Sequence, residues 1–157
     1  MAARFTRAVT GLLALAMWSA FGAAACDVQR VNINGHSMAP TLADGDWAVA
    51  DRAISEVNRG DVVAFRWPRD ESKSFVQRIV GMPGERIEMK DGRVSINGQP
   101  IEEPYVAEAN RSQDSWGPRL IPSGEYFTMG DNRRNSSDSR VWGNVTREHI
   151  WARVMVR

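Results

Sequence analysis

Short runs in which apolar and polar residues alternate recur along most of this chain, and turn residues separate them. A period of two residues is typical of β-strands, whereas a helix repeats its apolar positions every three to four residues. The runs that predict strands are residues 28–34, 47–50, 62–67, 75–80, 86–89, 93–96, 126–129, 141–143 and 150–156. Many short strands joined by turns predict a mainly β domain with a partly closed sheet.

The stretches between these runs predict turns and two loops. The sequence Lys-Asp-Gly at residues 90–92 joins two strand runs and is a hairpin signal. Residues 69–74 are polar, so we expect a loop there after Pro68. Residues 102–122 are polar with scattered prolines and glycines, which predicts a long loop or an insert.

The first residues show a different pattern, an unbroken apolar run. Arg4 and Arg7 precede residues 8–25, which contain no charged side chain. At about 1.5 Å per residue, a helix of this length would span a bilayer core of about 30 Å. The two arginines would stay on the cytoplasmic side, so the rest of the chain would be exported. We therefore expect an N-terminal membrane anchor or signal segment, residues 1–25, followed by one domain, residues 26–157.

Three interpretations of this apolar segment remain open. It is a retained anchor that crosses the cytoplasmic membrane once, or a signal peptide that is removed, since the alanines at 23–25 offer small residues for cleavage. It is otherwise a lipoprotein signal in which Cys26 is the lipidated residue. All three interpretations place the domain on the exported side of the cytoplasmic membrane, periplasmic or extracellular, in contact with membrane lipids.

Composition excludes several classes of protein. A length of 157 residues fits one domain, and a net charge of +1 without a basic run argues against a nucleic-acid partner. Cys26 is the only cysteine, which excludes an intramolecular disulfide. The two histidines, His36 and His149, lie far apart and lack the spacing of metal ligands. We expect no metal, no cofactor and a monomeric chain.

A candidate nucleophile lies at Ser37, within residues 35–42, Gly-His-Ser-Met-Ala-Pro-Thr-Leu. Pro40 fixes its own φ and biases the residue before it towards extended geometry, while Gly35 permits a sharp turn. Ser37 is thus expected on a stiff bend, which is how a chain presents a nucleophilic hydroxyl. The alternative is a turn serine that hydrogen-bonds its own backbone.

Two later blocks accompany this one. Residues 75–84 read Phe-Val-Gln-Arg-Ile-Val-Gly-Met-Pro-Gly, and residues 130–140 read Gly-Asp-Asn-Arg-Arg-Asn-Ser-Ser-Asp-Ser-Arg. Together with residues 35–42, in this order, they resemble type I signal peptidases, the membrane-bound serine endopeptidases that remove signal peptides. The resemblance covers residues 31–151 and implies a signal peptidase-like β fold.

The resemblance also implies a mechanism. In this family a neutral lysine accepts the proton of the nucleophilic serine, and the two form a Ser–Lys dyad. Ser37 matches the nucleophile, and its backbone N–H would be one oxyanion donor. Gly35 occupies the place where some members carry a second donor, a hydroxyl. Ser136 matches the hydroxyl that orients the lysine.

Five further positions match residues that support the site in this family. Ile33 and Met38 match apolar residues that shape pockets for small substrate side chains. Arg78 matches the arginine that follows the catalytic lysine, and Asp138 and Arg140 match a pair that braces the site. The resemblance therefore implies cleavage after small residues.

The catalytic lysine itself is replaced by Gln77. A primary amide has no usable basicity near neutral pH, and the eukaryotic members have histidine at this place. Two other residues are candidates for the base. Lys73 lies about 13 Å away along a strand, and His36 would have to reach Ser37 around a sharp bend. Arg134 is a second departure, since the family usually has aspartate there.

The expected function is that of a membrane-associated signal peptidase I-like serine endopeptidase. Its partners would be the signal peptides of exported preproteins, which it would remove after small residues. The alternative is an inactive pseudopeptidase that binds signal-peptide-like or membrane segments, or regulates a true peptidase. Gln77 favours the alternative, whereas the retained serines favour the enzyme.

Overall fold

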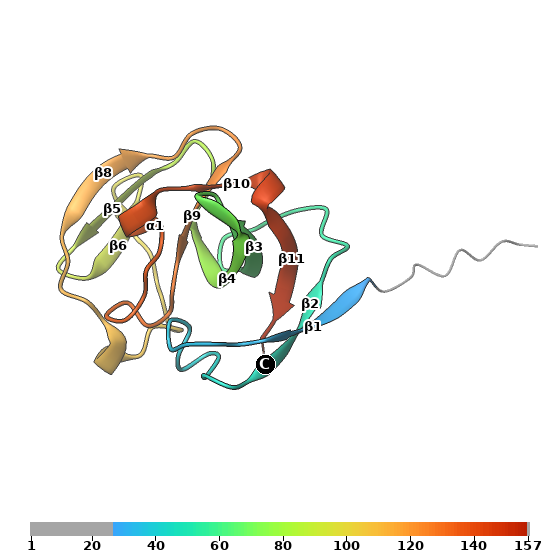
Figure 1. Cartoon of the computed structure of the whole chain (residues 1–157). Helices are drawn as coiled ribbons and strands as arrows, with labels where there is room; N and C mark the ends of the chain where they lie inside the picture. Colours follow the sequence, from blue (N-terminus) through green and yellow to red (C-terminus); the bar gives the residue numbers. More distant parts are fainter. Residues whose placement is uncertain (1–26, 157) are drawn as a thin grey trace, which may run out of the picture.

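The computed structural model describes residues 27–156, and within them two antiparallel sheets dominate (Figure 1). The larger sheet has the order β1 (Val28–Asn32), β2 (Trp47–Asp51), β11 (Ile150–Met155), β3 (Val62–Trp67), β4 (Asp70–Gly81), β9 (Glu125–Met129) and β10 (Val145–Thr146). The smaller sheet has the order β7 (Gln99–Pro100), β6 (Arg93–Ile96), β5 (Arg86–Lys90) and β8 (Trp116–Leu120). The helices are η1 (Glu108–Asn110), α1 (Ser139–Trp142) and η2 (Arg147–His149). The prediction of a mainly β domain is confirmed.

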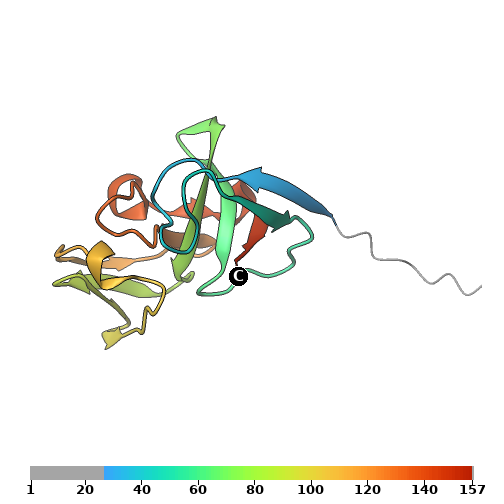
Figure 2. The same cartoon turned by 90° about the horizontal axis from the view of Figure 1, so that it is seen from below.

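The two sheets occupy opposite ends of the molecule. In Figure 1 the larger sheet curls, and its β1–β2 edge lies below β3 and β4. The strands β5, β6 and β8 of the smaller sheet lie on the left of this view. Figure 2 shows the β3–β4 hairpin projecting from this body. The smaller sheet is built from residues between β4 and β9, two strands that pair with each other in the larger sheet. It is therefore an excursion from the larger sheet.

The hydrophobic core anchors the turn that carries Ser37. Ile33, Met38 and Leu42 are buried against a cluster of small residues contributed by β2, β3 and β11. Complete burial of a side chain such as Met38 stabilises a fold by about 1.5–3 kcal/mol. The turn between β1 and β2 is consequently fixed to the sheet by its apolar side chains, on both sides of Ser37 along the chain.

The predicted loop at 69–74 is wrong, since β4 starts at Asp70 after a two-residue turn. Residues 70–74 extend beyond the core and are largely exposed, so their strand has no apolar face. Backbone pairing with β3, for example Arg66 with Ser74, forms the strand instead. A prediction from apolar alternation misses a strand that is solvated on both faces.

Two further predictions need correction. The strand predicted at 141–143 is the end of α1, because the Asp138 carboxylate accepts a hydrogen bond from the backbone N–H of Arg140 and caps a single helical turn. The loop predicted at 102–122 contains η1 and β8. The predicted N-terminal apolar helix, residues 1–25, lies outside the described residues. From 27 to 156, the chain forms no helix with the length and apolar character needed to cross a bilayer.

Candidate active site

Ser37 lies in a tight turn directly after β1, and it is half-buried. The backbone N–H of Ala39 donates to the carbonyl of His36 over 3.2 Å, and that of Leu42 donates to Met38 over 3.0 Å. These bonds coil the chain around the serine, as the Gly-x-Ser-x-x-Pro pattern predicts. With Met38 fully buried, the position of the backbone at Ser37 is set by the core.

The turn docks on the loop that begins at Gly130. The backbone N–H of Asn132 donates to the Ser37 carbonyl over 2.9 Å, and the Asn132 side chain donates to the His36 carbonyl over 3.1 Å. A methyl group added at Gly130 would overlap both the Ser37 carbonyl oxygen and the Ser136 hydroxyl. Both atoms thus lie against the same face of Gly130. The backbone of Ser37 and the hydroxyl of Ser136 therefore lie close together.

The Ser136 hydroxyl is buried and has no hydrogen-bond partner among the described residues. A buried hydroxyl without a partner normally costs about 1–3 kcal/mol, so such groups are rare and need an explanation. In the family that the sequence resembles, this hydroxyl would contact the catalytic lysine. Here Gln77 occupies that position, and its amide is bound elsewhere.

Gln77 is buried in β4, and both ends of its amide are hydrogen-bonded. The Thr128 hydroxyl donates to Gln77 Oε1 over 2.8 Å, and Gln77 Nε2 donates to the Ser137 carbonyl over 2.8 Å. Ser139 Oγ lies 3.2 Å from the Thr128 hydroxyl and accepts the Thr128 backbone N–H over 3.0 Å. These contacts fix the orientation of the amide, and they bring Gln77 to the same loop as Ser136.

Arg78, which follows Gln77 in the chain, forms a buried ion pair with Asp131. Its guanidinium binds both carboxylate oxygens of Asp131 over 2.8 and 2.7 Å and donates to the Gly60 carbonyl over 2.8 Å. The ring of Tyr105 stacks on the other face, 4.0 Å from the guanidinium carbon. The Thr41 hydroxyl also donates to Asp131 over 2.5 Å, so this carboxylate joins β4 to the turn of the candidate nucleophile.

Asp138 and Arg140 form a second ion pair beside the site. Arg140 donates to Asp138 through Nε over 2.8 Å and through Nη2 over 2.9 Å, and the Gly130 backbone N–H donates to the same carboxylate over 3.1 Å. Burial disfavours the charged guanidinium, yet the hydrogen bonds and charge of Asp138 outweigh it and raise the pKa of Arg140. The pair thus fixes the backbone of Gly130, beside which the Ser37 carbonyl oxygen and the Ser136 hydroxyl both lie.

The two alternative bases lie elsewhere. Lys73 is exposed on β4 and pairs with Asp70 over 3.0 Å, and its ammonium faces the ring of Trp67. His36 is exposed on the turn. Within the part of the chain that the structure describes, no hydrogen bond joins either side chain to Ser37. The second departure, Arg134, is exposed in the loop that begins at Gly130.

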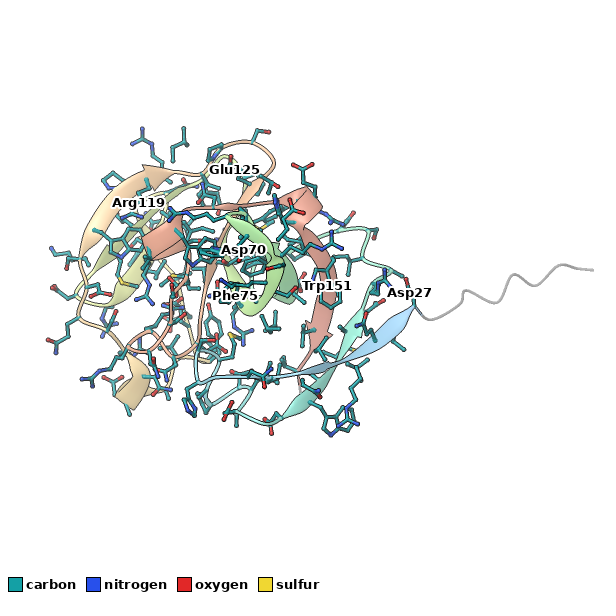
Figure 3. The ribbon with its side chains drawn as sticks, in the orientation of Figure 1. Asp27, Asp70, Phe75, Arg119, Glu125 and Trp151 are labelled. Carbon is teal, nitrogen blue, oxygen red and sulfur yellow. The ribbon has the colours of Figure 1, made fainter. Side chains whose placement is uncertain are left out.

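Two free strand edges flank this region. β9 pairs with β4 only at Arg78, Ile79 and Gly81, so residues 70–77 have a strand partner on one side only. β1 is the outer strand of the larger sheet and pairs only with β2. Figure 3 labels Phe75, which lies on this free part of β4 close to Gln77. An unpaired edge beside a candidate nucleophile can accept an extended peptide as an added strand.

The proposed pocket residues lie at the base of this region. Ile33 and Met38 are 5% and 1% exposed and belong to one core cluster, against which Val76 of β4 also packs. Their assignment to a substrate pocket stays a prediction.

Several residues of the site could not be found by motif reading. Glu103 is buried and forms a two-fold ion pair with Arg133, over 3.0 and 2.5 Å, and it accepts the Tyr105 hydroxyl over 3.2 Å. Burial, together with the nearby carboxylate, raises the pKa of Tyr105, so its hydroxyl remains a donor. Both residues fall in the stretch predicted as a loop. Asp131 and Thr41 were visible in the motif blocks, but their contact needs the folded chain.

Comparison with known proteins adds an independent finding. The profile of the family "Signal peptidase, peptidase S26" matches residues 5–157. A signal peptidase I of Leptolyngbya laminosa is 38% identical over 136 residues, which cover 80% of this chain and 66% of the relative. Signal peptidase I U of Bacillus subtilis is 41% identical over 118 residues, 69% of this chain and 63% of the relative. The chain thus spans less than two thirds of the length of these relatives.

A solved structure is also similar. A signal peptidase I from Enterococcus faecalis superimposes with a TM-score of 0.55 and 30% identity, covering 66% of this chain and all of that chain. The likeness extends over most of the described residues, so the sheet arrangement and the sequence blocks point to the same relatives.

Proposed function

Because this chain belongs to the signal peptidase family, peptidase S26, we propose that it is a serine endopeptidase that removes signal peptides from exported preproteins after small residues. One observation carries this proposal. The candidate nucleophile Ser37 and the hydroxyl of Ser136 rest against the same glycine, Gly130, beside a free strand edge.

In the proposed reaction the signal peptide adds as an extended strand to the free edge of β4. Its small side chains face Ile33 and Met38, and its scissile carbonyl lies at Ser37. The Ser37 hydroxyl attacks that carbonyl and loses its proton to a water molecule, while the backbone N–H of Ser37 stabilises the oxyanion. The peptide C–N bond then breaks, and the amine of the mature protein leaves with a proton from water. A further water molecule hydrolyses the acyl ester, which releases the signal peptide and restores the Ser37 hydroxyl. Asp138 and Arg140 hold the Gly130 backbone, and Arg78 with Asp131 holds the turn of Ser37 to β4.

The proton of the Ser37 hydroxyl has no side-chain acceptor at position 77. Gln77 is a neutral amide whose oxygen already accepts the Thr128 hydroxyl. A positioned general base contributes a factor of about 10²–10⁴ to such reactions. We therefore propose slow cleavage by this chain, with proton removal from Ser37 limiting the rate.

A second candidate function rests on the same residue. Both ends of the Gln77 amide are hydrogen-bonded, and the Ser136 hydroxyl has no partner within residues 27–156, which favours a protein that binds signal-peptide-like segments without cutting them. Binding would use the same free edge of β4. The two candidates differ only in whether the peptide bond breaks.

We further propose that the domain lies on the exported side of the cytoplasmic membrane, held there as a monomer by one N-terminal span. Arg4, Arg7 and the apolar run at 8–25 support this location. The exposed apolar side chains of Trp47, Met155 and Val156 at one edge of the larger sheet suit contact with lipid. Protease added to spheroplasts should digest the domain, whereas protection of the full-length chain would refute this location.

Cleavage decides between the two candidate functions. The purified chain is incubated with a preprotein that carries an Ala-x-Ala site, and the products are identified by mass. Slow release of the signal peptide by the native chain, abolished in Ser37→Ala, supports the enzyme. Saturable binding of the preprotein without any product, unchanged in Ser37→Ala, supports the binding protein.

A further inference from the structure

The stretch between β7 and β8 contacts all three sequence blocks that surround Ser37. Its Tyr105 stacks on Arg78, and its Glu103 pairs with Arg133. Further along, at the end of η1, Asn110 contacts the remaining block. This stretch therefore belongs to the site, although its sequence resembles a surface loop.

Asn110 joins the two segments that carry the catalytic hydroxyls. Its side-chain Nδ2 donates to the carbonyl of Ala39 over 2.9 Å. Its own carbonyl accepts the backbone N–H of Arg134 over 3.2 Å. Ala39 lies two residues after Ser37, and Arg134 lies two residues before Ser136. One asparagine thus bridges both sides of the reacting centre.

This bridge adds an attachment point for the turn to those already described. Asn132 binds the carbonyls of Ser37 and His36, and the Asp131 carboxylate binds Thr41. Asn110 ties the backbone just after Ser37, at Ala39, to the backbone just before Ser136. Reacting groups must be held within about 0.5 Å of their productive geometry, so this restraint bears directly on the rate.

Asn110 is itself held in place. Its backbone N–H donates to the Ala107 carbonyl over 2.8 Å, which closes the turn of η1. The ion pair of Glu103 with Arg133 is almost fully buried and secures the start of the same stretch. Because Asn110 is fixed in this way, its hydrogen bond restrains the position of the Ala39 carbonyl.

We propose that Asn110 is a positioning residue that holds the Ser37 turn and the Ser136 loop in register. The proposal rests on the proposed function of Ser37 and Ser136, but the contact that it assigns can be measured without any reaction. Asn110 touches neither the free edge of β4 nor the scissile bond, so it acts through the turn.

The first test is hydrogen exchange of single backbone amides in the folded full-length chain. In Asn110→Ala, the amide of Asn132 should exchange about tenfold faster, because the turn that accepts its hydrogen bond is released. The amide of Ile79, bonded to the Asp61 carbonyl over 2.8 Å, should be unchanged. Equal acceleration of both amides would indicate general destabilisation and would overturn the proposal, as would no change at Asn132.

Asn144 provides a matched control. Its Nδ2 also donates one hydrogen bond over 2.9 Å, to the Glu125 carboxylate, but it lies between α1 and β10. Asn144→Ala should leave the Asn132 amide at its native exchange rate. If it accelerates that amide as much as Asn110→Ala does, the effect is not specific to the bridge and the proposal fails.

Asn110→Asp tests the hydrogen bond itself. An ionised carboxylate has the shape of the amide but presents only acceptors to the Ala39 carbonyl, so the Asn132 amide should exchange faster than in the native chain at pH 7. Below about pH 4 the protonated acid can donate again. The exchange rate of the Asn132 amide, divided by its rate in the native chain at the same pH, should then fall back towards one in Asn110→Asp and stay high in Asn110→Ala. A ratio that is independent of pH would overturn the assignment.

Kinetics complete the test, in the native chain or in Gln77→Lys, whichever cleaves a preprotein. Asn110→Ala should lower kcat about tenfold and leave KM unchanged, since the peptide binds at the edge of β4. A raised KM with unchanged kcat would contradict a positioning role. If neither protein cleaves, the proposed function fails, while the exchange experiment still decides whether Asn110 holds the turn.

Discussion

The ion pairs around the site and the reacting centre between them differ in how fully their polar groups are hydrogen-bonded. Arg78, Arg133 and Arg140 each have a buried carboxylate partner, and each also donates to a backbone carbonyl. At the centre, the Ser136 hydroxyl has no partner among residues 27–156, and Gln77 donates to a carbonyl beside it. The ion pairs are thus complete, whereas position 77 carries a neutral amide and no basic group.

These ion pairs form a framework that supports the fold as well as the site, since an unpaired buried charge destabilises a fold strongly. Through Asp138 they fix the backbone of Gly130, beside which the Ser37 carbonyl lies. The comparison can be tested by restoring the centre, by breaking the framework, and by measuring the contacts that Gln77 makes instead.

Restoring the centre should have the largest effect. Gln77→Lys places an amine beside Ser136 and Ser137, and burial lowers the pKa of such a lysine towards neutrality. We expect cleavage of an Ala-x-Ala preprotein to rise by about 10²–10⁴-fold, measured as initial rates of product formation. Gln77→Met is the control, because it has similar length and no basic group.

The gain must also depend on the nucleophile. Ser37→Ala added to Gln77→Lys should abolish it. Activity that survives this second change, or a folded Gln77→Lys protein with no gain at all, would show that the framework does not position a base for Ser37.

Breaking the framework should affect stability first. Asp131→Asn leaves Arg78 buried beside a neutral amide, which should lower the free energy of unfolding by about 3–5 kcal/mol in urea denaturation. Asp27→Asn is the comparison, because Asp27 pairs with Arg52 over 3.8 Å at an exposed site. The loss of unfolding free energy in Asp27→Asn should remain below about 1 kcal/mol. Similar losses in the two variants would refute the distinction between framework and surface.

Gly130→Ala tests the contact between framework and centre. The added methyl overlaps the Ser37 carbonyl and the Ser136 hydroxyl, so the turn must move. We expect a loss of about 1–3 kcal/mol in unfolding free energy. In the Gln77→Lys background, cleavage should fall further than this loss of folded protein explains. Full activity in a stable Gly130→Ala protein would mean that the two serines need not share this surface.

The smallest expected effect concerns the amide network. Thr128→Val removes the donor to Gln77 Oε1 and should lower the unfolding free energy by about 1–3 kcal/mol. In the Gln77→Met background the same change should have less effect, because no acceptor is then left without a donor. A double-mutant cycle measures this coupling, expected at about 1 kcal/mol. Additive effects would mean that the hydroxyl and the amide do not interact.

Sequence patterns predicted the strands of the core better than those at the surface. The run at 86–89 alternates because one face is buried, whereas the run at 62–67 is apolar at successive positions because both faces are buried, and both are strands. The start of β4 has no buried face, so its sequence carried no signal. The run at 141–143, predicted as a strand, ends a helical turn that Asp138 caps, and apolar patterning does not register this contact between near neighbours.

The sequence by itself determined the class of fold, the three blocks, and the presence of Gln77 where the resemblance expects a lysine, because each depends on residue types at fixed spacing. Only the tertiary structure decided what Gln77 binds, that the Ser136 hydroxyl has no partner among the described residues, and that Glu103, Tyr105 and Asn110 lie beside the site. These contacts join residues from distant parts of the chain, for example Asn110 with Ala39. Such contacts depend on how the two sheets pack, and no local pattern of residues encodes that.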